Sequence, residues 1–126
     1  MTTTAASRPA ARVALLGRTA ALLAVGSAGV HLALAATGDP SAVVMALMAL
    51  ACLPCAWHLW WAPTGGVWAL TALVDAGMLA VHAPMLTADG HAGAHAGAHG
   101  PSTLVVAGLV LVAAQLTLAG TALLRR

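Results

Sequence analysis

The residues best suited to bind a metal ion form two sets, within which each member stands three or four positions from the next. The first set is Met45, Met48, Cys52 and Cys55, and the second is Asp75, Met78, His82 and Met85. Positions three and four residues apart share one face of an α-helix. Thioether, thiolate and imidazole groups are ligands that Cu(I) prefers, and thiolate and imidazole also suit Zn(II). The spacing therefore predicts two helix faces that bind copper or zinc.

A second interpretation of the same residues is packing between helices. Methionine is a flexible side chain that fills gaps, and free cysteine behaves as a small hydrophobic residue. Ala and Gly, which favour close helix contacts in membranes, are abundant around both sets. If the two segments form an antiparallel hairpin, counting from the turn predicts four pairs of neighbours: Cys55 with Asp75, Cys52 with Met78, Met48 with His82, and Met45 with Met85.

Asp75 is the most demanding of these residues, because it lies near the middle of an apolar segment. A charge at the centre of a bilayer costs about 3 kcal/mol or more, so such residues usually face the interior of a helix bundle. Gln115 lies at a similar depth in the last apolar segment. The sequence is compatible with an Asp75–Gln115 hydrogen bond and with a cation or proton site at Asp75.

Two histidines, His31 and His82, lie a few residues from the ends of the first and third apolar segments. These two segments run in the same direction in an up-down bundle, so we expect both imidazoles at one depth. They predict either a copper or zinc site or interior hydrogen bonds without a ligand. Haem is disfavoured, because the surrounding segments are mainly Ala, Val and Leu and provide few large apolar walls for a macrocycle.

Three further histidines follow one another at intervals of four in "HAGAHAGAH": His91, His95 and His99. The glycines of this stretch favour a flexible loop over a helix. Mobile imidazoles in such a loop bind Cu(II), Zn(II) or Ni(II) loosely. The alternative is a repeat that arose by codon slippage and has no role in binding.

The pair Cys52 and Cys55 also has the C-x-x-C spacing used in thiol–disulfide exchange. A membrane oxidoreductase of this kind normally needs a second cysteine pair to pass electrons on, and the chain has two cysteines in all. A redox role is therefore disfavoured.

The composition indicates which elements position these residues. Of the 126 residues, 61% are hydrophobic and 6% are charged, whereas a soluble domain has about 25% charged residues. Turn residues separate four apolar segments, 13–36, 42–61, 67–86 and 103–124, each near the roughly 20 residues that span a bilayer. We therefore predict an all-α integral membrane protein, a single up-down bundle of four transmembrane helices. Residues 1–12 are predicted to form a disordered tail, and residues 87–102 a His-rich external loop.

The charge distribution predicts the orientation of this bundle. The formal net charge is +2, and the five basic residues lie toward the two ends of the chain: Arg8, Arg12, Arg18, Arg125 and Arg126. Positive residues stay on the cytoplasmic side of a membrane, so both termini are expected in the cytoplasm. The chain has no Lys, Glu, Asn, Ile, Phe or Tyr, which indicates a high-GC bacterial genome and hence a bacterial plasma membrane.

All four tryptophans flank the "APTGG" turn at 62–66, at positions Trp57, Trp60, Trp61 and Trp68. Tryptophan prefers the membrane–water interface, so this cluster predicts a tight interfacial turn.

The first apolar segment has an alternative interpretation, because its basic flank, apolar run and "ALAA" at 33–36 resemble a cleaved secretory signal. The apolar run is long for a signal and contains His31, which favours a retained helix.

Two stretches, "VVMALMALACLP" and "VHAPML", carry Met and His at helical spacing inside apolar segments. In this respect the chain resembles small multi-helix membrane proteins of high-GC Gram-positive bacteria, over roughly residues 30–86. The resemblance is one of composition. It implies a membrane bundle with Met- and His-bearing helices and no particular activity.

Two functional hypotheses follow from these patterns. The first is binding or handling of a soft transition metal, copper first. The second is a non-catalytic packing or accessory subunit, in a homo-oligomer or in a larger membrane complex. The sequence contains no nucleotide-binding loop, Ser/His/Asp arrangement, paired carboxylates or HExxH motif, so an enzyme is not expected. The terminal arginines lack the density of a nucleic-acid-binding patch.

Overall fold

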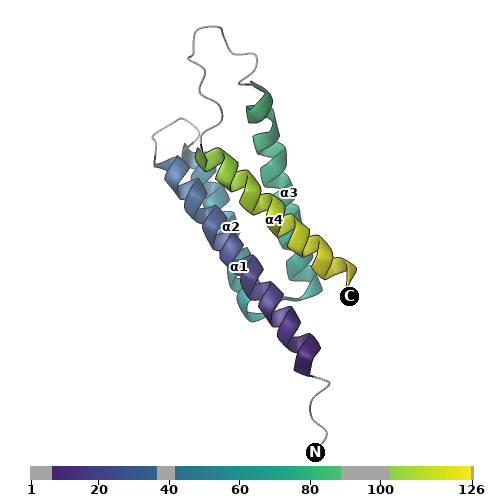
Figure 1. Cartoon of the computed structure of the whole chain (residues 1–126). Helices are drawn as coiled ribbons and strands as arrows, with labels where there is room; N and C mark the ends of the chain where they lie inside the picture. Colours follow the sequence, from purple (N-terminus) through teal and green to yellow (C-terminus); the bar gives the residue numbers. More distant parts are fainter. Residues whose placement is uncertain (1–6, 37–41, 89–102, 126) are drawn as a thin grey trace, which may run out of the picture.

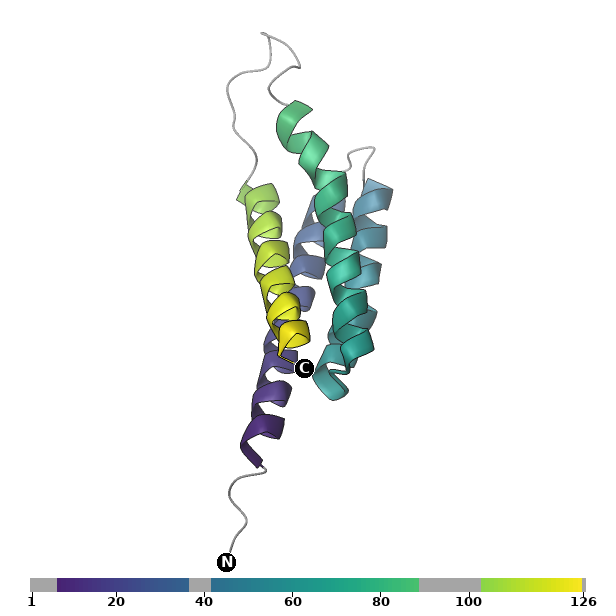
Figure 2. The ribbon, with the colours of Figure 1, turned by 90° about the vertical axis from the view of Figure 1, so that its right-hand side faces the viewer.

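The computed structural model describes residues 7–36, 42–88 and 103–125, with side chains placed for residues 11–36, 42–82 and 103–125. This part of the chain forms four α-helices: α1 (Ser7–Ala35), α2 (Ala42–Trp61), α3 (Gly65–Ala88) and α4 (Thr103–Leu124). Consecutive helices run in opposite directions, and the start of α1 lies at the same end of the bundle as the end of α4 (Figures 1 and 2). The prediction of an all-helical bundle is confirmed.

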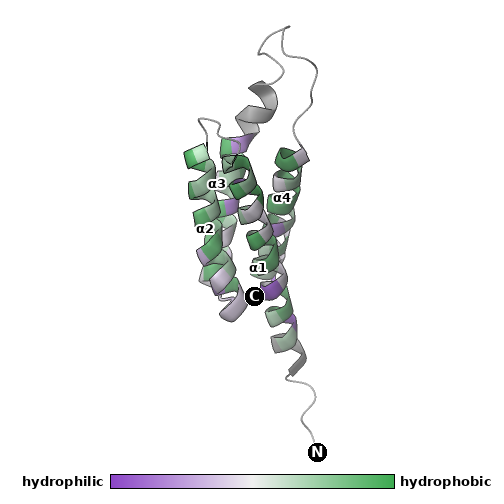
Figure 3. Ribbon diagram, turned by 90° about the vertical axis from the view of Figure 1, so that its left-hand side faces the viewer, coloured by the Kyte–Doolittle hydropathy of each residue, from purple (hydrophilic) through white to green (hydrophobic). Residues whose placement is uncertain are grey.

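Each of the four helices is long and apolar enough to cross a membrane. The candidate spans are Ala11–Ala35, Ala42–Trp61, Gly65–His82 and Thr103–Leu124. Many of the large side chains that face outward are Leu and Val, including Leu47 at 61% and Leu73 at 70% exposure. Figure 3 shows apolar residues over all four helices. Such an outer surface is compatible with contact to lipid.

The helix bounds agree closely with the sequence except at the start of α1. The bounds of α2 and α4 are the predicted ones, and α3 extends slightly beyond its predicted range at both ends. By contrast, α1 begins at Ser7, inside the stretch that was predicted to be a tail. Pro9 is tolerated in a first turn, and Ala10 and Ala11 are strong helix formers. The prediction of a disordered tail is therefore wrong for residues 7–12, while residues 1–6 and 89–102 lie outside the described residues.

The four helices pack as a ring in which α1 contacts α2 and α4, and α3 contacts α2 and α4. The interface between α1 and α2 is the most extensive and that between α2 and α3 the least. The expected back-to-back seam of the second and third helices is thus the smallest interface of the ring. Within the described residues, α1 and α3 lie diagonally opposite each other and make no close backbone contact.

Small residues explain why α1 and α2 pack so closely. Gly17 of α1 is buried, and so are several alanines of the two helices: Ala20, Ala21, Ala24 and Ala28 on α1, and Ala49 and Ala56 on α2. Without bulky side chains between them, two helix backbones approach closely and gain van der Waals contact, which drives helix association in lipid.

Buried apolar side chains form two clusters along the bundle. The Trp68 cluster consists of Ala20, Ala21, Ala24, Ala56, Leu59, Trp68, Ala119 and Ala122. The Met78 cluster consists of Ala28, Ala49, Cys52, Met78 and Val112. Each cluster draws on all four helices, so the two of them hold the bundle together at different depths.

The turn between α2 and α3 is closed by a helix cap. Oγ1 of Thr64 accepts a hydrogen bond from the backbone N–H of Val67 at 3.3 Å, the usual role of threonine at an N-cap position. Three of the four tryptophans, Trp57, Trp60 and Trp61, are exposed near this turn. The guanidinium carbon of Arg18 lies 5.5 Å from the centre of the Trp60 ring.

Trp68 departs from the prediction that all four tryptophans lie at an interface. It is 1% exposed and belongs to the core. The reason is the small size of its neighbours, because Ala20, Ala24, Ala56 and Ala119 leave room for an indole ring between the helices.

Gly17 lies where α1 approaches the α2–α3 turn most closely. A Cβ atom at this position would lie 2.5 Å from the carbonyl oxygen of Leu59 and 2.9 Å from Cβ of Pro63. Gly17→Ala is therefore expected to push α1 away from α2 and to lower the free energy of unfolding by about 1–3 kcal/mol. Thermal unfolding in detergent would measure this loss.

Gly29→Ala provides a matched control for Gly17→Ala on the same helix. No described atom lies within 4 Å of a Cβ added at Gly29. This variant should unfold at or slightly above the wild-type temperature, since alanine is the better helix former. Equal losses of stability in the two variants would contradict the close approach at Gly17.

Candidate functional site

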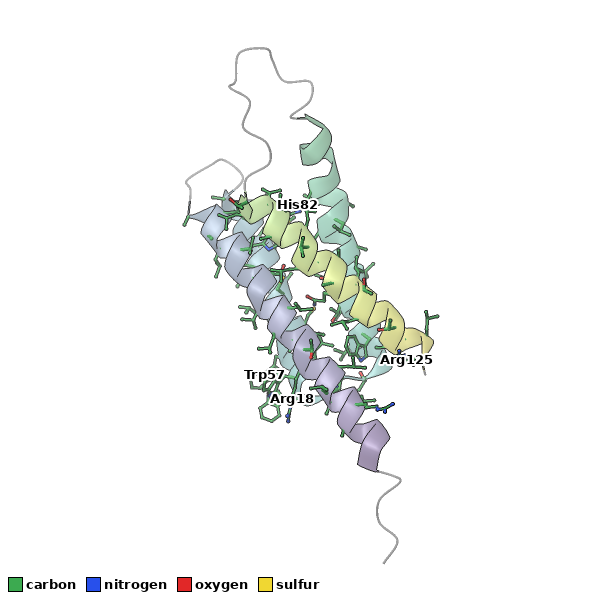
Figure 4. The ribbon with its side chains drawn as sticks, in the orientation of Figure 1. Arg18, Trp57, His82 and Arg125 are labelled. Atoms are coloured by element: carbon green, nitrogen blue, oxygen red, sulfur yellow. The ribbon has the colours of Figure 1, made fainter. Side chains whose placement is uncertain are left out.

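His31 of α1 and His82 of α3 meet inside the bundle. Their ring centroids are 5.6 Å apart, and the ring planes make an angle of 75°. The side chains are 3% and 9% exposed. Since α1 and α3 are diagonal, the side chains alone make this contact. Figure 4 shows His82 at the opposite end of the bundle from Arg18 and Trp57. The prediction that the two imidazoles lie at one depth is confirmed.

Each imidazole is oriented by its own helix in the same way. Nδ1 of His31 donates a hydrogen bond to the carbonyl oxygen of Ser27 at 2.8 Å, and Nδ1 of His82 donates to the carbonyl oxygen of Met78 at 2.8 Å. A carbonyl oxygen can only accept, so Nδ1 carries the proton and Nε2 carries a lone pair. A neutral imidazole with a free Nε2 is a metal ligand, and the Nδ1–H···O=C bond fixes its orientation.

The two rings line a small cavity between α1, α3 and α4. Its volume is about 20 Å³, which is room for about one water molecule or an ion of similar size. Met78 also lines it, and the other lining residues are aliphatic or glycine: Val30, Leu34, Leu79, Leu104, Val105, Gly108, Leu109 and Val112. Two imidazoles and one thioether are therefore the side chains of metal-ligand type that line an otherwise apolar cavity.

Cys52 extends this group of soft ligands into α2. Its Sγ lies 4.0 Å from Sδ of Met78, to which the thiol donates a weak hydrogen bond. The predicted pairing of Cys52 with Met78 is confirmed. Cys52 and Cys55 are both buried free thiols. Sulfur atoms therefore lie both at the cavity, on Met78, and on the neighbouring helix α2.

The remaining predicted donors do not line the cavity. Met45 is buried on the inward face of α2, and Met48 is half-buried against the Met78 cluster. The ring of His82 packs against His31, and the pairing of Met48 with His82 stays a prediction. The side chain of Met85 lies outside the described residues, as do His91, His95 and His99.

A metal centre in this region would need a donor other than His, Cys, Asp or Glu. In the described ranges, His, Cys, Asp and Glu side chains alone form no group of three or more that could hold a metal ion. A centre at His31 and His82 therefore depends on the thioether of Met78 as its third donor.

A second group of polar side chains lies between the two apolar clusters. This polar layer consists of Ser27 of α1, Thr71 and Asp75 of α3, and Gln115 of α4, each at most 3% exposed. Along α3, these residues follow Trp68 of one cluster and precede Met78 of the other. Along α4, Gln115 likewise lies between Ala119 and Val112. The layer therefore sits near the middle of the candidate membrane spans.

Two cysteines connect the polar layer to α2. Ser27 lies beside the thiol of Cys52, and Thr71 lies beside that of Cys55. Asp75 is close enough to both thiols to interact with them electrostatically. Oxygen atoms of α1 and α3 thus gather around a single turn of α2.

One oxygen atom of each residue in the layer has no hydrogen-bond partner among the described residues: Ser27 Oγ, Thr71 Oγ1, Asp75 Oδ2 and Gln115 Oε1. Asp75 Oδ2 thus takes no part in the predicted Asp75–Gln115 hydrogen bond, and donation from Gln115 Nε2 to Asp75 Oδ1 stays a prediction. An unpaired buried polar group costs about 1–3 kcal/mol, and a charged group at mid-membrane about 3 kcal/mol or more. The layer therefore holds four buried oxygens, from three helices, near the middle of the bundle.

Sequence reasoning identified Asp75 and Gln115 but missed Thr71 as a member of the layer. The available signal was its position four residues before Asp75, which places both on one face of α3. Ser27 was also missed as a member of the layer, although it lies four positions before His31. Its hydroxyl belongs to the layer, whereas its backbone carbonyl holds the imidazole.

Comparison of the chain with models of known protein families, with curated proteins and with solved structures finds no match.

Proposed function

We propose that this protein binds a single Cu(I) ion inside the membrane, through His31, His82 and Met78. The observation that carries the proposal is the meeting of two imidazoles from diagonal helices at one small cavity that Met78 also lines. Each ring is already held by a backbone carbonyl in the form that binds metal.

The spacing of the rings fits a shared ion. With metal–nitrogen bonds of about 2.0–2.1 Å, two imidazoles bound at a wide angle to one metal have centroids roughly 5–6 Å apart. The observed separation of 5.6 Å lies in this range. The cavity suits an ion rather than a haem macrocycle, because its volume is about 20 Å³.

The donor set favours copper over zinc. A thioether is a soft ligand that selects Cu(I), whereas structural zinc sites are nearly always tetrahedral and use thiolate, imidazole or carboxylate. The nearby thiol of Cys52 donates a hydrogen bond to Sδ of Met78. Cys52 and Cys55 would form the inner continuation of a soft-ligand route, away from the histidine end.

The membrane setting belongs to the same proposal. Four apolar helices of sufficient length, with arginines toward the ends of the chain, favour a multi-pass protein of a bacterial plasma membrane with both termini in the cytoplasm. In that orientation the histidine pair lies in the outer half, and the segment with His91, His95 and His99 lies outside, where it could deliver metal to the cavity.

The direct test is an anaerobic titration of the detergent-purified protein with Cu(I) in competition with a coloured Cu(I) chelator. A variant with His91, His95 and His99 replaced by alanine removes binding by that segment, so the stoichiometry reports on the bundle. We expect one Cu(I) per chain in this variant, and weaker binding of Zn(II).

A stoichiometry near zero for Cu(I) would overturn the proposal. If a partner protein were also retained through purification in mild detergent, the alternative of an accessory subunit of a membrane complex would be supported instead.

A further inference from the structure

The polar layer differs in chemistry from the histidine cavity. The cavity is lined by nitrogen and sulfur ligands, whereas the buried polar atoms of Ser27, Thr71, Asp75 and Gln115 are oxygens, with the thiols of Cys52 and Cys55 beside them. Hard cations prefer oxygen ligands, and soft cations prefer sulfur and imidazole. The two groups of side chains therefore suit different ions, although both lie on the inner faces of the same helices.

Charge balance calls for one positive charge in the layer. Asp75 is the only acidic residue in the described part of the chain, and the described arginines lie toward the ends of the sequence. A carboxylate at this depth requires either a proton or a bound cation. A proton on Asp75 would neutralise the carboxylate and provide one hydrogen-bond donor. A cation bound to Asp75 would neutralise it as well and would bind several of these oxygens at once.

We propose that the polar layer binds one Na⁺ ion, with Asp75 as the charged ligand and Ser27, Thr71 and Gln115 as neutral oxygen ligands. A monovalent ion neutralises the single carboxylate, whereas Mg²⁺ or Ca²⁺ would leave a net positive charge in the membrane. Mg²⁺ also keeps several water ligands, and Ca²⁺ takes six to eight oxygens. K⁺ carries the same single charge, and the measurement in KCl below separates it from Na⁺.

The test is the thermal unfolding of the metal-free, detergent-purified protein in NaCl, KCl or choline chloride at equal ionic strength. Ligand binding to the folded state raises the unfolding temperature in a saturable manner. At a Na⁺ concentration tenfold above the dissociation constant, we expect a rise of about 5 °C relative to choline. Asp75→Asn should abolish this rise, and Thr71→Val, which keeps the side-chain shape, should weaken Na⁺ binding at least tenfold.

Thr117→Ala provides the matched control for the loss of a hydroxyl. Oγ1 of Thr117 donates to the carbonyl oxygen of Ala113 on its own helix and faces outward, so the Na⁺ effect should persist. It should also persist in His82→Leu, which separates this site from the proposed copper site. If Asp75→Asn does not fold, Thr71→Val carries the test.

Three results would overturn the proposal. Unfolding temperatures could be equal in the three salts, which would leave the layer without a cation site. The Na⁺ effect could be unchanged in both Asp75→Asn and Thr71→Val. Stability could also depend on pH alone with no response to Na⁺, which would identify a protonated Asp75 in place of a bound ion.

Discussion

Replacing His82 by leucine should weaken Cu(I) binding by about 100-fold or more. Loss of a residue that merely orients a ligand costs about 10–100-fold in metal affinity, and His82 is itself a proposed ligand. Leucine keeps much of the volume and suits the aliphatic walls of the cavity, so the fold should survive. The affinity is measured by competition with a Cu(I) chelator, in the variant that lacks the three histidines at 91, 95 and 99.

His58→Leu is the control for this substitution. His58 lies near the C-terminal end of α2, where its side chain is exposed. It does not line the cavity. Its replacement should leave Cu(I) affinity unchanged. Met78→Leu should reduce the affinity for Cu(I) while affecting any Zn(II) binding less, since zinc gains little from a thioether. Equal copper affinities for His82→Leu and His58→Leu would remove His82 from the site.

Trp68→Ala should destabilise the bundle more than any other single truncation in its core. Truncation of a buried aromatic side chain to alanine costs about 3–5 kcal/mol, because it removes buried contact and leaves a cavity. Trp68 is 1% exposed, and the small alanines around it cannot expand into the space. The loss should appear as a large drop in the unfolding temperature in detergent.

Trp61→Ala is the matched control, since Trp61 lies near the same turn and is 67% exposed. Its removal should change the unfolding temperature little. A small effect of Trp68→Ala, comparable to that of Trp61→Ala, would show that the Trp68 cluster is not tightly packed. Circular dichroism on both variants would confirm that helix content is kept.

Most of the helical architecture was predictable, because apolar length and turn residues are local properties of the sequence. The bounds of α2 and α4 follow from where the apolar runs begin and end. The start of α1 was not predictable from hydropathy, since Ser7–Arg12 is polar yet rich in helix formers. The burial of Trp68 was also missed, because tryptophan preference for interfaces is an average that the alanine-rich neighbours override here.

Contacts in the candidate site were predictable where they depend only on how deep each residue lies along its helix. His31 and His82 lie on helices that run in the same direction, so their equal depth could be counted from the sequence, and Cys52 with Met78 could be counted across the turn. The order of helices around the ring could not be counted in this way. It depends on the close packing of α1 with α2 at small residues such as Gly17, and it places α1 diagonally opposite α3, where His31 meets His82.

The four helix interfaces of the ring differ in extent, and this difference should affect how an ion enters or leaves the bundle. Of the four helices, α3 is the one held least by its neighbours, and it carries His82, Met78, Asp75 and Thr71. Regions with few inter-helix contacts open at lower free energy than the rest of a protein. Brief excursions of α3, on the microsecond to millisecond scale typical of helix shifts, would therefore admit or release an ion while α1 and α2 stay locked together. Amide hydrogens of α3 should accordingly exchange with deuterium sooner than those at the α1–α2 seam.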